Sequence, residues 1–560
     1  MSWSDCPVPP MRCEALFGDR VLRCFANRPA SLHAMFEASV ARCPGAQALV
    51  FEGRRWTYAE CDAASARLAA GLAALGVVRG DRVLMLLGNR PEFVFTLLAL
   101  QRLGAIAVPV GVRERRPGLA YIARQCGAVA IVADDELADR LPDPDEAPAL
   151  RWRIAAGDGA PQGAAPETPA NAPANAPATT PANPTLAALI AAGHPVAAPV
   201  AAAETDVALI LYTSGTTGHP KGAMLTQLNL VHSVLHYQAC MRLGPAERSA
   251  LAVPASHVTG LVAIIATLLH CGGAIVIAPA FKAEAFIALM AAERVTHTMM
   301  VPAMYTLCLM QPGFATADLG AWRIGSYGGA PMPVATIDAI HQRLPGLTLV
   351  NAYGATETTS PATLMPMGRT RAHAHSVGIA LPAADIRVMD EGGRELPAGQ
   401  TGELWIAGPM VVPGYWANPE ATAASFTAGY WHSGDLGSVD AQGYVQVFDR
   451  QKDMLNRGGF KVYSVEVENV LMAWPGVVEA AVVGTPCPVL GERVHAVVHG
   501  PGAVRDEAAI KAFCAARLAD YKVPETFSWS DAPLPRNANG KLMKRLLRAS
   551  QAPPAPSGPA

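Results

Sequence analysis

Short apolar runs alternate with helix-like segments in the first part of the chain. Three of these runs have the length and composition of buried strands: 48–52 (ALVFE), 82–87 (RVLMLL) and 105–110 (AIAVPV). Two segments between them predict helices: 61–75 and 91–103. Thr57 and Glu60 form a capping-box pattern before the first helix, and Gly76 marks its end. This alternation, which recurs over 261–302, predicts a parallel sheet covered by helices.

The pattern changes near residues 449–454. Beyond them a short unit predicts a helix, two strands and a second helix, at 464–474, 479–484, 493–500 and 506–519. We therefore predict an α/β protein in which a large N-terminal domain of layered, mostly parallel sheets with helices carries a small, mobile α+β C-terminal domain. The expected divisions are 1–449, 450–548 and a disordered tail at 549–560.

Two segments differ from this pattern. Residues 155–185 are rich in alanine, proline and threonine, which predicts a disordered or extended surface insertion in the N-terminal domain. Residues 261–281 approach the length of a membrane span, but His270 and the Gly272–Gly273 pair divide them. We interpret this second segment as a buried helix, a turn and a buried parallel strand.

Composition narrows the class of protein. Of the 560 residues, 51% are hydrophobic and 16% are charged, and the net charge is -2. These values favour a folded protein without bulk attraction to nucleic acid or anionic membranes. The 11 cysteines are scattered without a CxxC pair, so we predict reduced thiols rather than disulfides or a zinc site. Because the N-terminus has no signal-peptide pattern, we expect a cytoplasmic protein without an integral membrane span.

The stretch LYTSGTTGHPKGAM (211–224) combines glycines, hydroxyl side chains and a lysine directly after an apolar strand. Glycines free backbone N–H groups to converge on anionic oxygens, so the stretch predicts a phosphate-binding loop. Pro220 precedes Lys221, unlike in a Walker A loop, and this loop need not lead straight into a helix. The predicted phosphate-binding residues in it are Thr213, Ser214, Gly215, Thr216, Thr217, Gly218 and Lys221.

The longer stretch YTSGTTGHPKGAMLT (212–226) resembles the signature of the ANL superfamily of adenylate-forming enzymes, which includes the AMP-forming acyl- and aryl-CoA synthetases. Further family motifs follow in order over nearly the whole chain: PASHVTG (254–260), GGAPMP (328–333), NAYGATET (351–358), HSGDLG (432–437), FDRQKD (448–453) and PLPRNANGK (533–541). Gln227 departs from the pattern, because these enzymes often carry histidine there.

The resemblance implies roles for residues of the N-terminal domain. Glu357 would be a catalytic residue and a Mg2+ ligand, Thr356 a phosphate contact, and His257 a catalytic residue that positions the carboxylate. The residues implied for adenine and ribose are Gly328, Gly329, Ala330, Pro331, Asn351, Tyr353, Asp435 and Arg450. Mg2+ held by one carboxylate and substrate phosphates is ordinary coordination chemistry.

The resemblance also implies roles for the C-terminal domain. Lys541 would be the catalytic lysine that bridges the carboxylate and the α-phosphate, and Lys452 the hinge at which this domain turns. The loop RGGFK (457–461) would bind coenzyme A through Gly458, Gly459 and Lys461. We interpret the remaining cations as an ordinary basic C-terminus: Lys544, Arg545 and Arg548.

The implied reaction is an AMP-forming acid–thiol ligation that uses ATP, Mg2+ and coenzyme A. Acid and ATP would give acyl-AMP and pyrophosphate, and coenzyme A would then displace AMP. The segments expected to line the acid pocket are mainly apolar, which favours a fatty or aromatic acid: 255–263, 299–304, 327–332 and 351–355.

Three alternatives stay open at this point. One is an adenylation enzyme that loads a separate carrier protein. The second is an ordinary P-loop NTPase, which the loop spacing opposes. The third is a non-catalytic relative, which the intact Lys541, Glu357 and Asp435 oppose. A homodimer and a lysine acetyltransferase acting on Lys541 are further expected partners.

Overall fold

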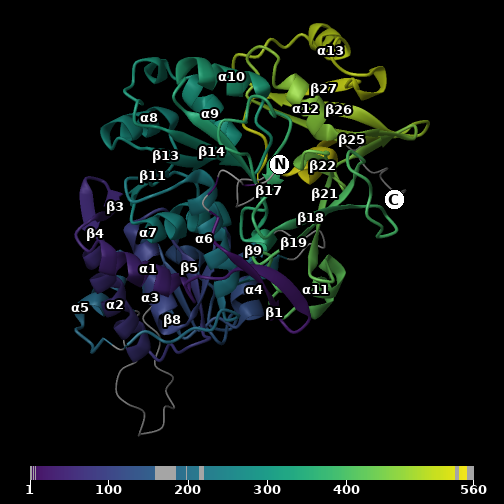
Figure 1. The fold of residues 1–560 in the computed structure, drawn as a ribbon. Helices are drawn as coiled ribbons and strands as arrows, with labels where there is room; N and C mark the ends of the chain where they lie inside the picture. The colour runs from purple at the N-terminus through teal and green to yellow at the C-terminus, as the bar shows by residue number, and fades with distance from the viewer. Residues whose placement is uncertain are drawn as a thin grey trace, which may run out of the picture.

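The computed structural model describes residues 3, 6, 8–157, 184–196, 198–213, 220–536 and 542–551. The alanine- and proline-rich insertion predicted at 155–185 lies mostly outside these residues, as does most of the predicted tail. Figure 1 shows the N-terminal elements gathered at one end of the molecule and the C-terminal elements gathered beside β21 and β22.

A six-stranded sheet forms the first layer of the N-terminal part. Its order is β10 (Lys221–Thr226), β9 (Val207–Thr213), β6 (Ile106–Pro109), β5 (Arg82–Leu86), β7 (Ala130–Ala133) and β8 (Trp152–Ala155). All neighbours are parallel except β9 and β10, which form an antiparallel pair. The three apolar runs predicted as strands near the N-terminus therefore exist, and the runs at 82–87 and 105–110 lie side by side in this sheet.

A 14-stranded sheet forms the second layer. Its parallel part contains β3 (Gln47–Phe51), β12 (Ala274–Ile277), β11 (Arg248–Leu251), β13 (His297–Met300), β14 (Ile324–Gly328) and β15 (Thr348–Tyr353). β4 (Arg54–Thr57) pairs antiparallel with β3 at the edge. These parallel strands are short and mostly buried, which explains why they read as continuous apolar runs.

The second half of this sheet is antiparallel and was not predicted. It contains β16 (Thr363–Leu364), β17 (Gly378–Ala380), β22 (Tyr444–Arg450), β21 (Tyr430–Val439), β19 (Gly402–Ala407) and β18 (Asp385–Met389), with β20 (Phe426–Thr427) beside β21. These strands are half-buried and carry polar motif residues, so they lack a strong apolar signal. A separate hairpin joins β1 (Met11–Leu16) and β2 (Arg20–Phe25).

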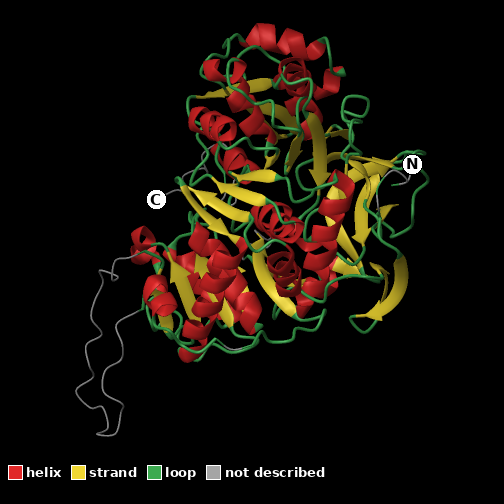
Figure 2. Ribbon diagram, turned by 60° about the vertical axis from the view of Figure 1, so that its left-hand side comes forward, coloured by secondary structure: helices red, strands yellow, loops and turns green. Residues whose placement is uncertain are grey.

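Helices cover both layers, as Figure 2 shows. They are α1 (Leu32–Arg42), α2 (Tyr58–Ala74), α3 (Pro91–Leu103), α4 (Arg116–Cys126), α5 (Leu186–Ala191), α6 (Gln227–Met241), α7 (Thr267–Cys271), α8 (Ala283–Ala292), α9 (Pro302–Leu309), α10 (Val334–Arg343) and α11 (Pro419–Ser425). The capping box of Thr57 and Glu60 is confirmed at the start of α2. α3 is buried over nearly its whole length, and one apolar core joins it to strands of both sheets.

The apolar segment 261–281 is a buried helix, a turn and a strand, as predicted. It begins within a π-helix, η2 (Thr259–Ala266), and continues through α7 to β12, with Gly272 at φ +83° in the turn. The Thr267 hydroxyl donates to the Val262 carbonyl at 2.8 Å, and the backbone N–H of Thr267 donates to the same carbonyl at the end of the π-helix. Within the described residues, none of the helices is both long and apolar enough to cross a membrane.

The C-terminal domain has its own sheet and core. The five strands are β24 (Phe460–Val462), β23 (Leu455–Arg457), β26 (Gly491–His499), β25 (Glu479–Cys487) and β27 (Thr526–Ser530). Its helices are α12 (Ser464–Leu471), α13 (Glu507–Ala515) and α14 (Lys544–Gln551). The predicted helix–strand–strand–helix order is confirmed, and the hairpin β23–β24 and strand β27 are additions to it. The boundary at residue 450 stays a prediction.

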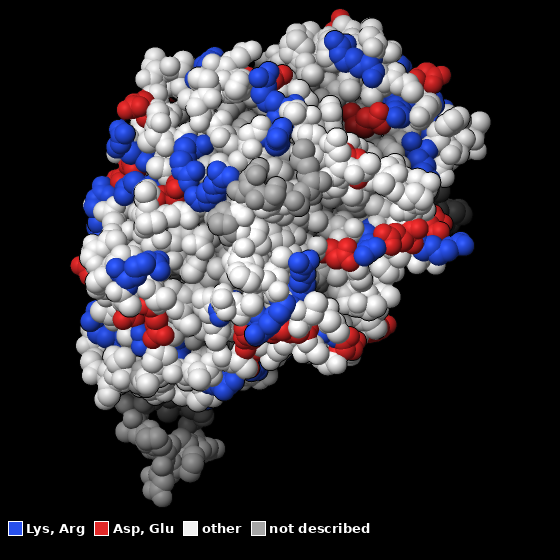
Figure 3. Space-filling model, in the orientation of Figure 1, with Lys and Arg blue, Asp and Glu red and all other residues white. Residues whose placement is uncertain are grey.

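The eleven cysteines are all free thiols, as predicted. Figure 3 shows acidic and basic side chains interspersed over one face of the molecule, with both signs close together. Such a mixed surface agrees with the near-zero net charge.

Candidate active site

The phosphate-loop sequence lies at the tip of the hairpin β9–β10. β9 ends at Thr213 and β10 begins at Lys221, and these two residues are opposite each other in the register. The chain therefore enters a strand after Pro220, and the loop does not lead directly into a helix. The backbone N–H of Trp416 donates to the Gly222 carbonyl at 2.7 Å, which attaches β10 to the 414–416 segment. The other predicted loop residues lie outside the described residues: Ser214, Gly215, Thr216, Thr217 and Gly218.

Glu357 faces this hairpin from the second sheet. It lies in a short 3-10 turn (Thr356–Thr358) directly after β15, and its side chain is buried. The Thr213 hydroxyl contacts Glu357 Oε1 at 3.4 Å, and the Tyr415 hydroxyl donates to the same oxygen at 3.0 Å. The structure therefore brings together two residues that the sequence predicted for one site, although 144 positions separate them.

Tyr415 is a site residue that sequence reasoning missed. Burial, and next the neighbouring Glu357 carboxylate, raise the pKa of its hydroxyl, so Tyr415 stays a neutral donor. The Lys221 ammonium lies 5.2 Å from the centre of the Tyr415 ring, a cation–π contact. No residue spacing in the sequence connects Tyr415 with Glu357, and only folding shows the contact.

The surroundings of Glu357 fit a bound Mg2+. Within the described part of the chain, its carboxylate contacts neutral hydroxyls and forms no ion pair, which leaves a buried negative charge for an outside cation. The described residues contain no group of three or more His, Cys, Asp or Glu side chains that could hold a metal by themselves. A metal here would therefore be completed by substrate oxygens, which is common for Mg2+.

Asp435 and Arg450 form a second cluster that the sequence predicted. They are opposite each other on β21 and β22, and Arg450 Nε lies 3.3 Å from Asp435 Oδ1. The Tyr353 hydroxyl donates to Asp435 Oδ2 at 2.7 Å. Burial, and then the Asp435 charge, raise the pKa of Tyr353. Three of the residues implied for adenine and ribose therefore lie in direct contact.

The other residues implied for adenine differ in their exposure to solvent. Gly328 is half-buried at the end of β14, whereas Gly329, Ala330 and Pro331 are exposed just beyond it. A Cβ on Gly328 would lie 2.3 Å from the Ala352 carbonyl oxygen, so the two strands need glycine here to approach each other. Asn351 is buried, and its amide contacts the Ser376 carbonyl at 3.4 Å. The residues implied for adenine are therefore open to solvent just beyond the carboxyl end of β14.

His257 lies at the start of the π-helix. The Thr259 N–H donates to His257 Nδ1 at 3.3 Å, and the Thr259 hydroxyl lies 3.1 Å from the same nitrogen. Because Nδ1 accepts a hydrogen bond, the proton of the neutral ring lies on Nε2. Thr259 lies in the PASHVTG motif, although the sequence interpretation assigned it no role of its own. Its hydrogen bond to Nδ1 leaves Nε2 as the donor of the neutral His257 ring.

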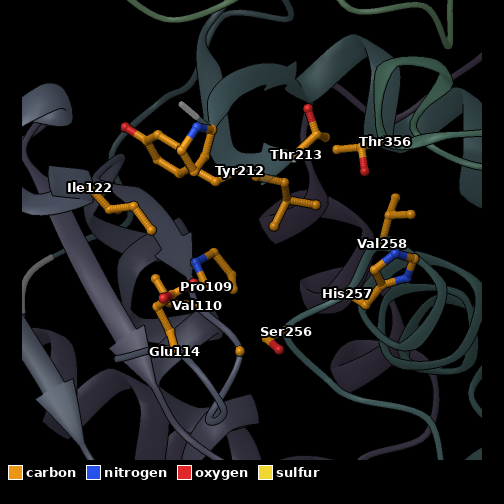
Figure 4. A pocket seen from close by; sticks show the side chains of 13 residues that line it. Pro109, Val110, Glu114, Ile122, Tyr212, Thr213, Ser256, His257, Val258 and Thr356 are labelled. Carbon is orange, nitrogen blue, oxygen red and sulfur yellow. The ribbon is translucent and has the colours of Figure 1, made fainter. Parts of the chain in front are cut away.

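A cavity of about 120 Å3 is lined by three of the predicted site residues: Thr213, His257 and Thr356. Figure 4 shows Thr213 and Thr356 at one end of it, with His257 and Val258 along one wall and Glu114 on the opposite side. Of the segments expected to line an acid pocket, 255–263 and 351–355 lie at or next to this cavity, whereas none of its lining residues comes from 299–304 or 327–332. Glu114, from the loop after β6, is a charge on the wall that the sequence interpretation did not include.

The predicted coenzyme A residues are not brought to this cavity. Gly458, Gly459 and Lys461 are exposed around the turn of β23–β24. The Gly459 N–H donates to the Asn456 side chain at 3.1 Å, within the C-terminal domain itself. Lys452, the predicted hinge, is also exposed. Lys541 lies outside the described residues.

Gln227, the departure from the family pattern, has a structural role. It is buried at the first position of α6. Its side-chain Oε1 accepts from the backbone N–H of Leu32 at 2.9 Å, and its side-chain Nε2 donates to Gln101 Oε1 at 2.9 Å. The side chain therefore joins α6 to α1 and α3. The position does not line the cavity.

Two family models match most of the chain. The AMP-binding enzyme model covers residues 36–416, and the AMP-binding enzyme C-terminal domain model covers 466–541. The chain therefore belongs to the family of AMP-binding enzymes, within the ANL superfamily of adenylate-forming enzymes and its acyl- and aryl-CoA synthetase branch.

Curated relatives match over nearly their whole length. The chain is 35% identical to a feruloyl-CoA synthase of Amycolatopsis sp over 90% of this chain and 96% of that protein. It is 32% identical to the long-chain-fatty-acid–CoA ligase FadD13 of Mycobacterium tuberculosis over 88% and 93%. It is 31% identical to the fatty acid–[acyl-carrier-protein] ligase ScoC of Streptomyces coeruleorubidus over 92% and 95%.

A solved structure shares the fold. The ATP-bound MatB of Rhodopseudomonas palustris aligns with a TM-score of 0.80 at 32% identity, over 93% of this chain and 99% of that one. This likeness agrees with the layered N-terminal part and the separate C-terminal domain described above.

Proposed function

We propose that the protein is an AMP-forming acid–CoA ligase that activates a fatty or aromatic carboxylic acid. In the first step an acid oxygen attacks the α-phosphorus of ATP, and pyrophosphate leaves. In the second step the thiol sulfur of coenzyme A attacks the acyl carbon, its proton is lost to solvent, and AMP leaves. ATP dependence follows from the family, whereas the acid and the thiol are the proposal.

One observation carries this proposal most directly. Glu357, Thr213, Tyr415 and Lys221 meet where the phosphate-loop strand ends. A buried carboxylate that accepts, among the described residues, only from hydroxyls is suited to a cation that arrives with a nucleotide. Lys221 adds positive charge within reach of phosphate oxygens at the same strand end.

Mg2+ is the metal we propose for this site. When bound, it would offset negative charge on the phosphates and so ease the approach of an anionic carboxylate. The residues that would hold it are Glu357, with the Thr213 hydroxyl beside it. Tyr415 orients the Glu357 carboxylate from the other side, as partners behind a metal ligand commonly do.

The cavity supports an acid that is largely apolar. Its wall combines Pro109, Val110, Ile122, Leu211 and Val258 with the hydroxyls and His257 near one end. The Nε2–H of His257 would donate to the acid's carboxylate, which would place the reacting oxygens beside Thr356 and Thr213. The two relatives that act on feruloyl and long-chain fatty groups agree with this class of acid.

A carrier protein is the second candidate for the thiol substrate. The similarity to a fatty acid–[acyl-carrier-protein] ligase favours it, because that relative is nearly as similar as those named for coenzyme A. The exposed Gly458–Gly459 turn would serve either thiol, since both end in the same kind of flexible arm. Coenzyme A remains the proposal because two of the three relatives carry it in their names.

A product test decides between these functions. The purified full chain is incubated with ATP, Mg2+, coenzyme A and a panel of fatty and aromatic acids, and nucleotide and thioester products are measured. We expect AMP, pyrophosphate and an acyl-CoA in equal amounts. Release of ADP would overturn adenylate formation, and thioester formation with a holo-carrier protein alone would replace coenzyme A.

A further inference from the structure

The N-terminal hairpin β1–β2 carries one buried charge. Arg20, the first residue of β2, is buried, whereas Arg23 on the same strand is exposed. The hairpin precedes residue 36, where the match to the AMP-binding enzyme model begins, so that match says nothing about its role. The contacts of Arg20 indicate a role, because they lead to the candidate active site.

Arg20 holds two consecutive peptide units of the segment 412–416. Its Nη1 donates to the Val412 carbonyl at 3.1 Å, and its Nη2 donates to the Pro413 carbonyl at 2.9 Å. Burial lowers the pKa of the guanidinium, and the charge of Asp19 acts in the opposite direction. An arginine side chain nevertheless stays protonated in a folded protein, so these two carbonyls compensate a buried cation.

The segment 412–416 contacts the proposed metal site directly. The backbone N–H of Val412 donates to the Glu357 carbonyl at 2.9 Å, and the Tyr415 hydroxyl donates to Glu357 Oε1 at 3.0 Å. The same segment is joined to β10, the strand that follows the phosphate-loop sequence. Arg20 therefore holds the backbone of the segment that supplies a hydrogen-bond donor to the Glu357 side chain.

A ring contact gives Arg20 a second connection to Tyr415. The guanidinium carbon lies 5.5 Å from the centre of the Phe426 ring, which is a cation–π contact. The rings of Phe426 and Tyr415 meet edge to face, with their centres 5.9 Å apart and an angle of 64° between their planes. Arg20 thus supports both the backbone next to Tyr415 and the Tyr415 ring.

The hairpin has attachments that do not involve Arg20. Leu22 and Cys24 pack with Leu228 of α6 in a small apolar cluster, and the backbone N–H of Phe25 donates to His232 Nε2 on the same helix at 3.1 Å. Removal of the Arg20 guanidinium would therefore leave the hairpin attached to α6. Its effect should be local to the contacts described above.

We propose that Arg20 is a positioning residue for the proposed metal ligand, because it holds Tyr415 in place to orient the Glu357 carboxylate. Glu357 would touch the metal, whereas Arg20 would act only through Tyr415 and its segment. This inference rests on the proposed function, in which Glu357 holds the Mg2+ that accompanies ATP. An oriented carboxylate binds a metal without first losing conformational freedom, so loss of Arg20 should weaken Mg2+ binding.

Arg20→Met tests the proposal, with Arg23→Met as the matched control. Methionine keeps an unbranched apolar side chain but has no N–H donors. Arg23 is exposed and makes no hydrogen bond or ion pair within the described residues. In the full chain, Arg20→Met should weaken the apparent affinity for Mg2+ in ATP–pyrophosphate exchange about fivefold. The KM for the acid should be unchanged, and Arg23→Met should alter neither quantity.

A double-mutant cycle with Tyr415→Phe tests whether Arg20 acts through Tyr415. Tyr415→Phe alone should weaken the apparent affinity for Mg2+ about tenfold. Independent effects would multiply to about fiftyfold in the double variant, whereas a shared path keeps the loss below about twentyfold. A general loss of packing would not depend on the Tyr415 hydroxyl.

Hydrogen exchange gives a measurement that does not depend on catalysis. The backbone amides of peptides covering 412–416, followed by mass spectrometry, should exchange faster in Arg20→Met than in wild type or Arg23→Met. Arg20→Lys should restore part of the protection, because an ammonium can reach a carbonyl but lacks the fork geometry of the guanidinium. If Arg20→Met does not fold, Arg20→Lys replaces it in both measurements, with smaller changes expected in the same direction.

The outcomes separate this proposal from the proposed function. Equal behaviour of Arg20→Met and Arg23→Met in the Mg2+ titration would overturn it, and so would multiplicative effects in the double variant. Faster hydrogen exchange across the whole N-terminal part would also overturn it, because that result indicates a general structural role. If wild type forms no acyl-AMP, the proposed function fails, and the hydrogen-exchange comparison still decides whether Arg20 holds the segment 412–416.

Discussion

Two buried carboxylate clusters of this molecule are built in opposite ways. Glu357 is surrounded by hydroxyls of Thr213 and Tyr415 and has no ion-pair partner among the described residues. The buried Asp449 and the half-buried Glu468 lie near a cation of the chain itself, Lys544. Lys544 pairs directly with Glu468, and its charge lowers the pKa of Asp449 against the effect of burial. A carboxylate whose counter-ion is built into the chain serves the fold, because the charge is balanced before any ligand arrives. A carboxylate without one is available to a ligand that brings positive charge.

The largest effect on activity is expected from a substitution in the first cluster. Glu357→Gln keeps the size and an acceptor oxygen for Tyr415 but removes the charge. Because the charge would hold the metal and phosphates of the reacting nucleotide, ATP–pyrophosphate exchange should fall by on the order of a hundredfold or more. The melting temperature should stay within a few degrees of wild type or rise. A large loss of stability without loss of exchange would show that Glu357 has a structural role like that of Asp449.

The second prediction concerns a substitution in the other cluster and its effect on stability. Lys544→Met leaves the half-buried Glu468 without its cation, so the C-terminal domain should lose about 3 kcal/mol of stability. Denaturant unfolding followed by limited proteolysis would locate the loss. Adding Glu468→Gln should recover much of it, since the unpaired charge is then removed. If the double variant is as unstable as Lys544→Met, the ion pair is not the cause.

The stability of the N-terminal part and of the C-terminal domain should respond differently to acid pH, because burial keeps several histidines of the N-terminal part neutral. Burial lowers the pKa of His232 to about 4, and of His236 and His297 to about 3, all in the N-terminal part. Between these values and the usual 6.5, the unfolded chain binds more protons than the folded chain, so stability falls as pH decreases from 6.5 towards 4. At pH 5.5 each histidine should cost about 1 kcal/mol relative to pH 7.

The C-terminal domain should respond less to the same change. In its described residues one histidine, His495, has a lowered pKa. The pKa of Glu468 is raised by burial, and such a group favours the folded state as pH falls, which is the opposite direction. Calorimetry between pH 7 and 5 should therefore show the N-terminal transition moving down further. Equal shifts of both transitions would contradict this contrast.

The smallest expected effect concerns Tyr415. Tyr415→Phe keeps the ring under Lys221 but removes the hydroxyl that donates to Glu357. The apparent affinity for Mg2+ should weaken by about tenfold, as it does when a partner behind a metal ligand is lost. A titration of activity against Mg2+ in wild type and Tyr415→Phe measures this. No change in Mg2+ dependence would show that Tyr415 does not orient the carboxylate.

Much of the fold could be predicted because its signals are local. The run at 82–87 and the helix at 91–103 became β5 and α3, and the Thr57 cap lies where its pattern indicated. The antiparallel strands β16 to β22 could not be predicted, since their half-buried faces and polar motif residues weaken the periodic signal. Their pairing depends on partners far away in the chain.

The candidate site could be predicted only in part, because sequence motifs are local whereas many contacts in the site join distant parts of the chain. Motif residues such as Glu357 and Asp435 could be identified by resemblance, and the structure shows which of them meet. Tyr415 and Glu114 belong to no pattern that was used, and Thr259 lies in PASHVTG without a role of its own assigned to it. The roles of all three come from contacts made only in the folded chain.

The π-helix next to His257 has a consequence for how such a pocket changes over generations. A π-helical turn holds one more residue than an α-helical turn. Deletion of a single residue between Thr259 and Ala266 could therefore be absorbed by a return to α-helix, with both ends kept in place. The helix that follows the wall residues Ser256, His257 and Val258 would then change its shape without any substitution. Changes in chain length, and not only in side-chain size, are thus a route by which the surroundings of the proposed acid pocket can change.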